Sequence, residues 1–324
     1  MNEVIFMTDP KRVEAFFDAI DESCLALYEE LGTPYLDGIA ETINNLMAGT
    51  VGQRGLKPVT RTRLSESLKT LRETEFQKEE IRKAMQLAIL RGFKHVRRPN
   101  GDITPDTIGL LCVFLLEKLY AGAKKLVLLD PLAGTGNLLL TIANNLSIET
   151  VPAGVENDIA SYRLAEAMFD AMEYPDEGLY FQDTFTFRHF QADAVVTDFP
   201  IEKPQRGKYL PFDTIRFHHE NLVPGGYFLA VIPDDFFEVE GSGDFRNLLK
   251  DLYQVVGLVK LPATMFKQMG KSILILQKRQ EGMDMITKVL LAEIPSFQDP
   301  EAVNEALRRM AGWFSDNIKK KEDN

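Results

Sequence analysis

Apolar positions along the first ninety or so residues follow a helical period. After Asp9-Pro10 they recur every three or four residues, at Val13, Phe16, Phe17, Ile20 and Cys24. Asp9 can accept from the free N–H groups of a first turn, and Pro10 suits the first helical position because no N–H is needed there. Similar spacing predicts further helices over residues 35–47, 64–71 and 81–89. We therefore expect a helical N-terminal region.

From Leu110 onward, helical stretches alternate with short runs rich in β-branched residues. The candidate strands are Leu126–Leu129, Thr150–Val155, Leu179–Phe181, Ala194–Thr197, Tyr227–Ile232, Val255–Lys260 and Ser272–Gln277. This alternation predicts a mostly parallel sheet of seven strands covered by helices on both faces. About a dozen residues separate the last two strands, too few for a helical crossover, so we expect the last strand to be antiparallel.

A chain of 324 residues is long enough for one sizeable domain and a smaller one. We expect a helical domain over 1–95, an α/β domain over 96–295 and a C-terminal helix and tail over 296–324. The longest apolar run, Leu110–Leu116, is far short of the roughly 20 residues that cross a bilayer. Because the first residues also lack the pattern of a signal peptide, we expect a cytoplasmic protein without a membrane segment.

Charge is unevenly distributed along the chain. The net charge is −11, yet residues 53–98 hold thirteen Lys or Arg against five Glu, so that segment carries +8 and the remainder −19. One interpretation is a solvated helix face; the other is a phosphate-binding surface, with DNA expected ahead of RNA. The sequence leaves the oligomeric state open, with a homodimer among the alternatives.

The cysteines and histidines do not form a metal-binding pattern. Cys24 and Cys112 lie within apolar helical stretches without further ligand-type residues at metal spacing, so we interpret both as core residues. His218 and His219 are adjacent, and adjacent helical residues point in different directions. We assign no metal.

A glycine-rich turn follows the first predicted strand. The strand "KLVLLD" leads into "PLAGTGNLLL", where Gly134 and Gly136 allow the backbone to approach a ligand and the following helix offers free N–H groups. Leu139 replaces the third glycine of the dinucleotide fingerprint, which disfavours a nicotinamide cofactor without excluding it. Asp130 ends the strand, where its carboxylate can face a positive ammonium group.

Acids also end the next two predicted strands. Glu156 follows the glycine turn by about twenty residues, the place where a carboxylate can accept from both ribose hydroxyls. Asp183 comes after the third strand, where it can accept from an adenine amine. Ligands of open α/β sheets bind at these carboxyl ends, so we expect Asp130, Glu156 and Asp183 to line one pocket for a nucleoside-bearing cation.

The motifs "DPLAGTGNLLL", "GVEND", "FQDTF" and "VVTDFPI", in this order, resemble those of amino-directed DNA methyltransferases. They are most similar to the methylation subunits of type I restriction-modification systems and to the YtxK-like methylase homologues, over about residues 104–278. The resemblance implies a Rossmann-like class I methyltransferase fold that binds S-adenosylmethionine, with Asp130 at the methionine end, Glu156 at the ribose and Asp183 at the adenine. The remaining cofactor residues that it implies are Thr104, Pro105, Ala133, Gly134, Thr135, Gly136, Asn137, Leu138, Asn157, Thr184 and Asp198.

The segment "DFPI" stands where the family has its catalytic motif. In that motif, a side-chain oxygen and a backbone carbonyl accept the hydrogens of an adenine amine, while an aromatic ring stacks on the extruded base. Asp198 can still accept, but Phe199 replaces the first proline and Ile201, after Pro200, replaces the aromatic residue. Loss of the stack removes roughly 1–3 kcal/mol per base, unless Phe199 stacks instead.

We therefore expect an S-adenosylmethionine-dependent methyltransferase most similar to the adenine-amino enzymes, with Asp198, Phe199, Pro200 and Ile201 as the altered catalytic motif. Methylation of an RNA or of a small molecule is an alternative. A module that binds the cofactor and regulates without turnover is another, and a nicotinamide-dependent oxidoreductase is a third.

Overall fold

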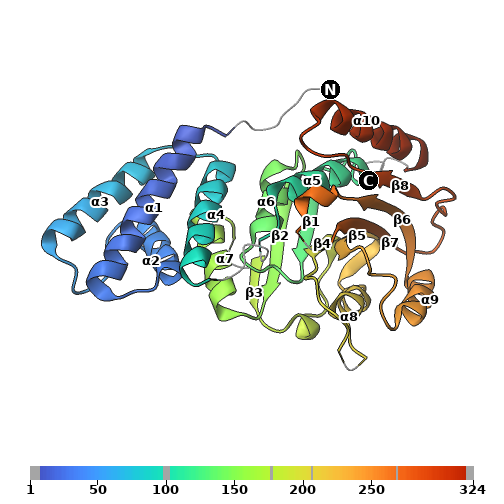
Figure 1. The fold of residues 1–324 in the computed structure, drawn as a ribbon, viewed down its shortest axis with the longest axis horizontal. Coiled ribbons are helices and arrows are strands. Elements are labelled where there is room, and N and C mark those ends of the chain that lie inside the picture. The colour runs from blue at the N-terminus through green and yellow to red at the C-terminus, as the bar shows by residue number, and fades with distance from the viewer. Residues whose placement is uncertain (1–7, 98–102, 176–177, 206, 268, 319–324) are drawn as a thin grey trace. The chain divides into compact units, whose positions relative to one another are not determined.

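The computed structural model describes residues 8–97, 103–175, 178–205, 207–267 and 269–318. Within these residues, eight strands form one mixed sheet in the order β3-β2-β1-β4-β5-β7-β6-β8 (Figure 1). The chain groups into two compact units. The first unit comprises residues 1–109, 133–145 and 154–181, and the second comprises residues 110–132, 146–153 and 182–324.

The first unit begins with four helices. These are α1 (Pro10–Leu31), α2 (Tyr35–Ala48), α3 (Pro58–Glu73) and α4 (Lys78–His95), as predicted from the apolar period. Asp9 caps α1 by accepting from the Lys11 N–H, and α1 ends at Gly32, whose φ of 73° lies in the left-handed region. Gln77 and Glu80 form a reciprocal capping box at the start of α4. Local sequence therefore determines where these helices begin and end.

Three further elements complete the first unit. They are α6 (Asn137–Asn145), α7 (Ile159–Ala171) and β3 (Leu179–Phe181), together with the end of β2 (Glu149–Glu156). Helix α2 packs against α7, and α4 packs against α6. The glycine turn before α6 thus lies in the same compact unit as the N-terminal helices.

The second unit holds most of the sheet. Its strands are β1 (Lys125–Asp130), β4 (Ala192–Asp198), β5 (Leu222–Pro233), β6 (Tyr253–Lys260), β7 (Lys271–Lys278) and β8 (Leu290–Glu293). Its helices are α5 (Asp106–Leu119), which starts within the first unit, α8 (Leu210–Phe217), α9 (Ser242–Leu252), α10 (Pro300–Asn317) and the short η3 (Thr184–Thr186) and η4 (Ala263–Met265). Strand β5 is buried along nearly its whole length, as expected for a central strand covered on both faces.

All seven predicted strands are present, and β7 is antiparallel to both of its neighbours, as the short connection predicted. The eighth strand, β8, extends the sheet by pairing in parallel with β6, with Glu293 opposite Lys260. Leu291 of β8 is 77% exposed, as is common for a strand at the edge of a sheet.

The two cysteines, Cys24 and Cys112, are fully buried, which confirms their interpretation as core residues. No helix in the described ranges has both the length and the apolar content needed to cross a membrane.

Candidate functional site

The glycine turn before α6 has the backbone that its sequence predicts. Gly134 and Gly136 adopt φ of 55° and 79°, in the left-handed region that favours glycine. A Cβ on Gly134 would meet nothing within 4 Å, so its backbone angle, rather than crowding, calls for glycine there. The Ala133 N–H donates to the Val155 carbonyl at 2.9 Å, and the Gly136 N–H donates to Ala133 at 2.8 Å. The turn is therefore bound to the end of β2.

Glu156, at the end of β2, is hydrogen-bonded to this turn. Its Oε2 accepts from the Gly134 N–H at 2.8 Å, while Oε1 accepts from the N–H groups of Asn157 and Asp158 at 2.8 and 2.7 Å. These contacts fix the orientation of a half-buried carboxylate. Two carboxylate oxygens offer about four lone-pair directions, so Glu156 keeps capacity to accept another donor. Asn157 itself is exposed.

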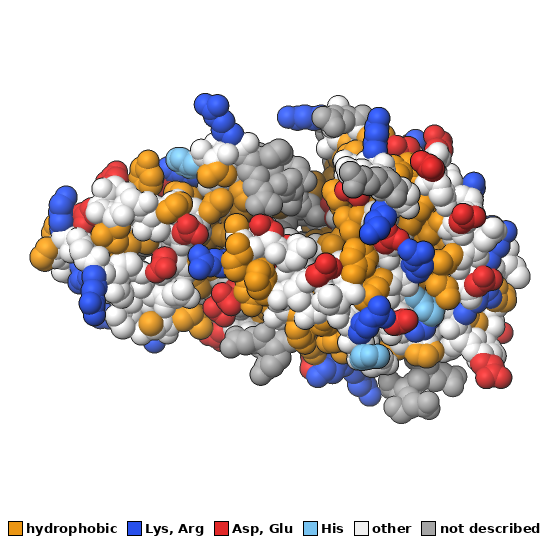
Figure 2. All heavy atoms as spheres, turned by 90° about the horizontal axis from the view of Figure 1, so that it is seen from below, with side chains coloured by type: hydrophobic (Ala, Val, Ile, Leu, Met, Phe, Trp, Pro, Cys, Tyr) orange, Lys and Arg blue, Asp and Glu red, His pale blue; other side chains and the backbone are white. Residues whose placement is uncertain are grey.

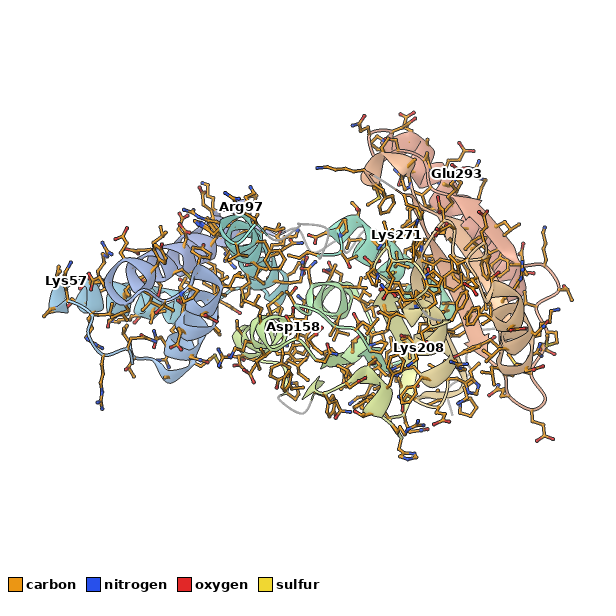
Figure 3. The ribbon with its side chains drawn as sticks, turned by 60° about the horizontal axis from the view of Figure 1, so that its bottom comes forward. Lys57, Arg97, Asp158, Lys208, Lys271 and Glu293 are labelled. Atoms are coloured by element: carbon orange, nitrogen blue, oxygen red, sulfur yellow. The ribbon has the colours of Figure 1, made fainter. Side chains whose placement is uncertain are left out.

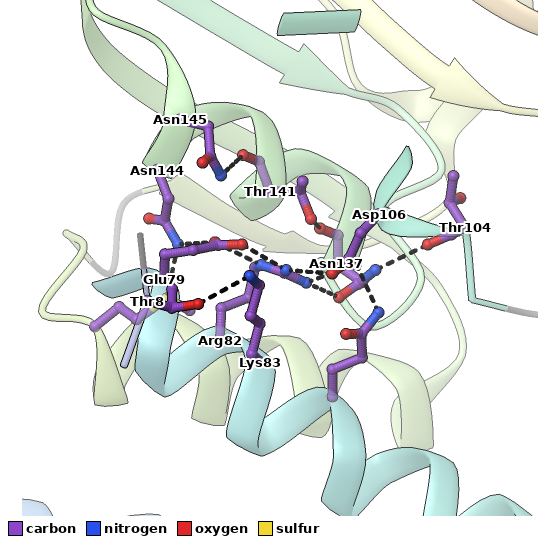
Figure 4. Close-up of polar contacts among 12 residues, drawn as sticks. Thr8, Glu79, Arg82, Lys83, Thr104, Asp106, Asn137, Thr141, Asn144 and Asn145 are labelled. Atoms are coloured by element: carbon purple, nitrogen blue, oxygen red, sulfur yellow. Dashed lines mark hydrogen bonds and ion pairs between the residues drawn. The ribbon is translucent and has the colours of Figure 1, made fainter. Parts of the chain in front are cut away.

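A buried polar cluster at the start of α6 is centred on Arg82 of α4 (Figure 4). The Arg82 guanidinium donates to both carboxylate oxygens of Glu79, at 2.7 and 2.8 Å, and to those of Asp106, at 2.9 and 3.2 Å. It also donates to Oδ1 of Asn137 at 2.6 Å, and the Asn137 amide donates to the Thr104 carbonyl at 3.0 Å. The cluster thus joins α4 to two segments predicted to hold the cofactor.

Burial and charge act in opposite directions on this cluster. Burial alone would raise the pKa of Asp106, but the charge and hydrogen bonds of Arg82 and a hydrogen bond from Gln86 lower it below its ordinary value. Burial likewise opposes the charge of Arg82, whose pKa is nevertheless raised by Glu79 and Asp106. The cluster therefore holds a buried cation between two carboxylates.

Arg82 was counted in the basic segment 53–98, and both interpretations of that segment are wrong for this residue. It is 0% exposed, so it neither faces solvent nor reaches a phosphate. The sequence held a signal for this: Arg82 shares a helical face with the buried Met85 and Ile89. A charged residue on an apolar stripe calls for an internal partner.

Thr104 and Pro105 come just before α5. Thr104 is half-buried and bound through its carbonyl, whereas Pro105 is exposed and its carbonyl accepts from the Ile108 N–H at 2.9 Å. Within the glycine turn and the start of α6, five of the predicted residues are buried, namely Ala133, Thr135, Gly136, Asn137 and Leu138.

Two of the predicted acids lie near each other in the second unit. Asp130 is 2% exposed at the end of β1, where its Oδ1 accepts from the Leu132 N–H at 3.0 Å. Burial raises the pKa of the Cys112 thiol on α5, and the charges of Asp198 and Asp130 raise it further. Both carboxylates are therefore close enough to act on one buried thiol.

Two predicted cofactor residues follow β3, and they differ in exposure: Asp183 faces solvent and Thr184 faces the core. Asp183 is exposed and caps η3 by accepting from the Phe185 N–H at 2.8 Å. Thr184 is buried, and its hydroxyl lies 2.8 Å from Nε2 of the buried His218. Burial lowers the pKa of His218 to about 4, so the ring is neutral at physiological pH. Thr184 is thus tied to a neutral histidine in the core.

The "DFPI" segment follows β4. Phe199 is fully buried and offers no free ring face, whereas Ile201 is 44% exposed and aliphatic. Asp198 and the Phe199 carbonyl both accept from the ammonium of Lys271, at 2.6 and 2.7 Å, and Pro200 is exposed beside them. Sequence reasoning gave no role to Lys271, because it lies 73 residues away from Asp198.

The basic segment 53–98 is partly neutralised within the first unit. Besides the buried Arg82, four of its cations form ion pairs with nearby acids: Lys57 with Glu30, Arg63 with Glu22, Lys69 with Glu73 and Arg91 with Asp21. Lys94 and Arg97 are exposed, and Arg98 lies outside the described residues. On the face drawn in Figure 2, basic and acidic side chains are interspersed rather than separated into one basic surface.

Comparison with known proteins agrees with this architecture. The family model of the YtxK N-terminal helical domain matches residues 14–93. The uncharacterized protein YtxK of Bacillus subtilis (strain 168) is 32% identical over 323 residues, which cover 93% of this chain and 97% of that protein.

Solved structures give the same result for the fold. A proposed class I S-adenosylmethionine-dependent methyltransferase from Listeria monocytogenes is 29% identical, with a TM-score of 0.84 over 94% of this chain and all of the other. The methyltransferase subunit of a type I restriction-modification system from Streptococcus thermophilus is 15% identical, with a TM-score of 0.58 over 97% of this chain and 75% of its own. The class I methyltransferase fold expected from the motifs is confirmed.

Proposed function

The chain belongs to the YtxK family, and from this premise we propose that it binds S-adenosylmethionine at the glycine turn and at the carboxyl ends of the neighbouring strands. The cofactor residues in this proposal are those expected from the motifs: Thr104, Pro105, Asp130, residues 133–138, Glu156, Asn157, Asp183, Thr184 and Asp198. The bound cofactor would supply an electrophilic methyl group on its sulfonium.

The observation that carries the proposal is the hydrogen bond from the Gly134 N–H to Glu156, at 2.8 Å. It fixes Glu156, the proposed ribose acceptor, against the glycine turn that we propose to contact the cofactor. A carboxylate whose direction is already fixed loses little freedom when a ribose donates to it, and such preorganisation favours binding. The Arg82 cluster supports the proposal further, because it holds Asn137 and Thr104 in place on the same unit.

Calorimetry tests the cofactor assignment. We expect S-adenosylmethionine and its demethylated product to bind and NAD not to bind. Glu156→Gln should weaken binding about tenfold or more, because it removes the charge from a carboxylate that accepts ribose hydroxyls. Glu149→Gln, at the exposed start of the same strand, is the matched control and should bind as the wild type does. Tight binding of NAD, or an unaltered affinity in Glu156→Gln, would contradict the proposal.

For the reaction, we propose methyl transfer to an amine, as in the adenine-amino methyltransferases that the motifs resemble. The hydrogen-bonding half of the catalytic motif supports this, because the Asp198 carboxylate and the Phe199 carbonyl lie within reach of a single nitrogen. The stacking half is absent: Phe199 is buried and Ile201 has no aromatic ring. An amine in an RNA or a small molecule is therefore the alternative acceptor to DNA.

Transfer of a labelled methyl group tests turnover. Unmethylated DNA, RNA and a fractionated lysate are incubated with the protein and labelled cofactor. Incorporation that disappears in Asp198→Ala and persists in Asp251→Ala, an exposed acid of α9, supports catalysis.

A second candidate is a module that binds the cofactor without turnover. The contact between Lys271 and Asp198 favours it, because the acceptor groups of the motif are already in use. Cofactor binding without incorporation into any of the three pools would select this candidate.

A further inference from the structure

Lys271 lies at the two atoms that the catalytic motif uses to hold an acceptor amine. It is the first residue of β7 (labelled in Figure 3), which is separated from β4 by β5 in the sheet. Its side chain crosses the end of β5, and its Nζ lies 2.6 Å from Oδ1 of Asp198 and 2.7 Å from the Phe199 carbonyl oxygen.

These two contacts have the same form as those of an adenine amine. In the motif, one N–H of the amine is accepted by the side chain at the first position and the other by a backbone carbonyl. Lys271 supplies one nitrogen that donates to both kinds of acceptor. An internal ammonium thus makes the hydrogen bonds that an external amine would need.

The backbone holds Lys271 at this place from both sides. The Leu261 N–H donates to the Lys271 carbonyl, and the Asp234 N–H donates to the carbonyl of Gly270, each at 3.0 Å. A Cβ on Gly270 would lie 2.3 Å from the Asp234 carboxylate, so a side chain at this position would require Asp234 to move. The Lys271 and Asp198 side chains are 10% and 14% exposed, and water has little access to either.

Charge decides which donor takes the two acceptors. An ammonium bound to a carboxylate makes a charge-assisted hydrogen bond, which is roughly twice as strong as that of a neutral amine. A base amine would have to displace this ion pair, and it would leave the Lys271 charge in a poorly hydrated place.

We propose that Lys271 is the specificity-determining residue of the acceptor site: its ammonium occupies the amine position and excludes a neutral base amine from Asp198. This inference rests on the proposed function, since Asp198 and the Phe199 carbonyl hold an acceptor amine only if the protein transfers a methyl group to one. An acceptor of the wild-type protein must displace Lys271, and substitution of Lys271 opens the site to adenine.

The test compares two single-stranded oligonucleotides that differ by one amine, one with a central adenine and one with purine in its place. Fluorescence anisotropy gives the affinity of each for the full chain, with and without the demethylated cofactor product. The ratio of the two affinities isolates the contribution of the amine.

Lys271→Met removes the ammonium but keeps an unbranched side chain. Lys278→Met is the matched control: Lys278 ends the same strand, and its Nζ also makes two hydrogen bonds, but both go to backbone carbonyls, those of His219 and Leu222, at 2.7 Å each. Lys271→Arg keeps a cation at the site, and Lys271→Gln is a second neutral variant in case the methionine variant does not fold.

We expect the wild type, Lys278→Met and Lys271→Arg to bind both oligonucleotides equally. Lys271→Met and Lys271→Gln should prefer the adenine oligonucleotide by about tenfold, the effect of one hydrogen bond to a charged group. A wild type that already prefers adenine, or neutral variants without a preference, would overturn the proposal. So would the gain of a methyl group on Lys271 after incubation with S-adenosylmethionine, because Nζ would then be an acceptor. Calorimetry on the same proteins tests cofactor binding separately. The ratio of the two oligonucleotide affinities can be measured whether or not the cofactor binds, so the two proposals can fail independently.

Discussion

Arg82 and Lys271 are both buried cations that contact acids, but they differ in how they are held. The planar guanidinium of Arg82 donates to three side chains at once, Glu79, Asp106 and Asn137. Lys271 ends in a compact ammonium on a flexible stem and donates to one side chain and one carbonyl. A guanidinium surrounded by fixed partners has no alternative position, whereas a lysine can exchange its partner by rotating its stem.

The comparison indicates two different roles for buried charge in one fold. Arg82 is a structural link between α4, α6 and the Thr104 segment, and it touches no predicted catalytic group. Lys271 binds the catalytic motif directly. Loss of Arg82 should therefore lower both the unfolding free energy and the affinity for the cofactor, whereas loss of Lys271 should change the affinity for the acceptor.

The largest expected effect is that of Arg82→Met. Removing one partner of a buried ion pair leaves Glu79 and Asp106 uncompensated, which costs about 3–5 kcal/mol of unfolding free energy. The affinity for S-adenosylmethionine should fall as well, since Asn137 and Thr104 lose their anchor. Urea unfolding and calorimetry measure the two effects.

Arg63→Met is the control for this change. Arg63 pairs with Glu22 at 2.8 Å, but the two side chains are 57% and 39% exposed, so its loss should cost less than about 1 kcal/mol. Equal losses in the two variants would remove the distinction between a buried link and a surface pair.

His218 differs from both buried cations, because it is a buried base whose ring lies against a hydroxyl and an amide. The His218 ring nitrogens lie within hydrogen-bond distance of the Thr184 hydroxyl and the Asn221 amide, and burial lowers the pKa of His218 from 6.5 to about 4. Between these values the unfolded chain binds a proton that the folded chain does not. Stability is therefore complete above pH 6.5 and falls as the pH falls toward 4, by roughly 2 kcal/mol at about pH 5.

Urea unfolding at about pH 7 and about pH 5 measures this loss. Burial and Lys278 also lower the pKa of His219, which adds to the loss with the same sign. His218→Asn should remove most of the pH dependence, whereas His189→Asn should retain it, because His189 is exposed and Asn tolerates its φ of 64°. An unchanged slope in His218→Asn would show that His218 is charged in the folded protein.

Lys271→Met should have a smaller effect on stability, of about 1–2 kcal/mol, because it leaves one carboxylate, Asp198, without its cation, whereas Arg82→Met leaves two. Lys278→Met should lose a similar amount. The affinity for S-adenosylmethionine should stay within about threefold of the wild type in both, in contrast to Arg82→Met. A large loss of cofactor affinity in Lys271→Met alone would place Lys271 among the cofactor-binding groups.

The sequence predicts the fold well because periodicity is a local property. The apolar period locates α1 to α4, and the β-branched runs locate seven strands within a few residues of their observed bounds. The stretch "KVLLAEI" around β8 is also strand-like in sequence, but its pairing with β6 depends on distant parts of the chain. The hydrogen bond from Gly134 to Glu156 follows from a fixed spacing between a glycine turn and the next strand end.

The partners of Arg82 and Lys271 could not be predicted in the same way. Arg82 reaches Asn137 across 55 residues and Lys271 reaches Asp198 across 73, so both contacts depend on how distant elements pack. Composition alone placed Arg82 in a basic surface. A charged residue at an apolar helical position carries more information than the count of charges in its segment.

The smallest expected effect concerns exposed cations. Lys94 lies in the last turn of α4 and Arg97 lies just after this helix. Lys94→Ala with Arg97→Ala should change the unfolding free energy by less than about 0.5 kcal/mol. If the first unit binds DNA, retention on immobilised duplex should fall steeply with salt, and this double variant should reduce the salt slope by about 2, because each phosphate contact contributes about one counterion. The control is Arg63→Ala with Lys69→Ala, whose cations already pair with Glu22 and Glu73. Equal salt slopes in both double variants and the wild type would assign Lys94 and Arg97 to a solvated face. Of the cations compared in these experiments, the buried Arg82 and Lys271 would then be the ones with a role in the proposed methyltransferase site.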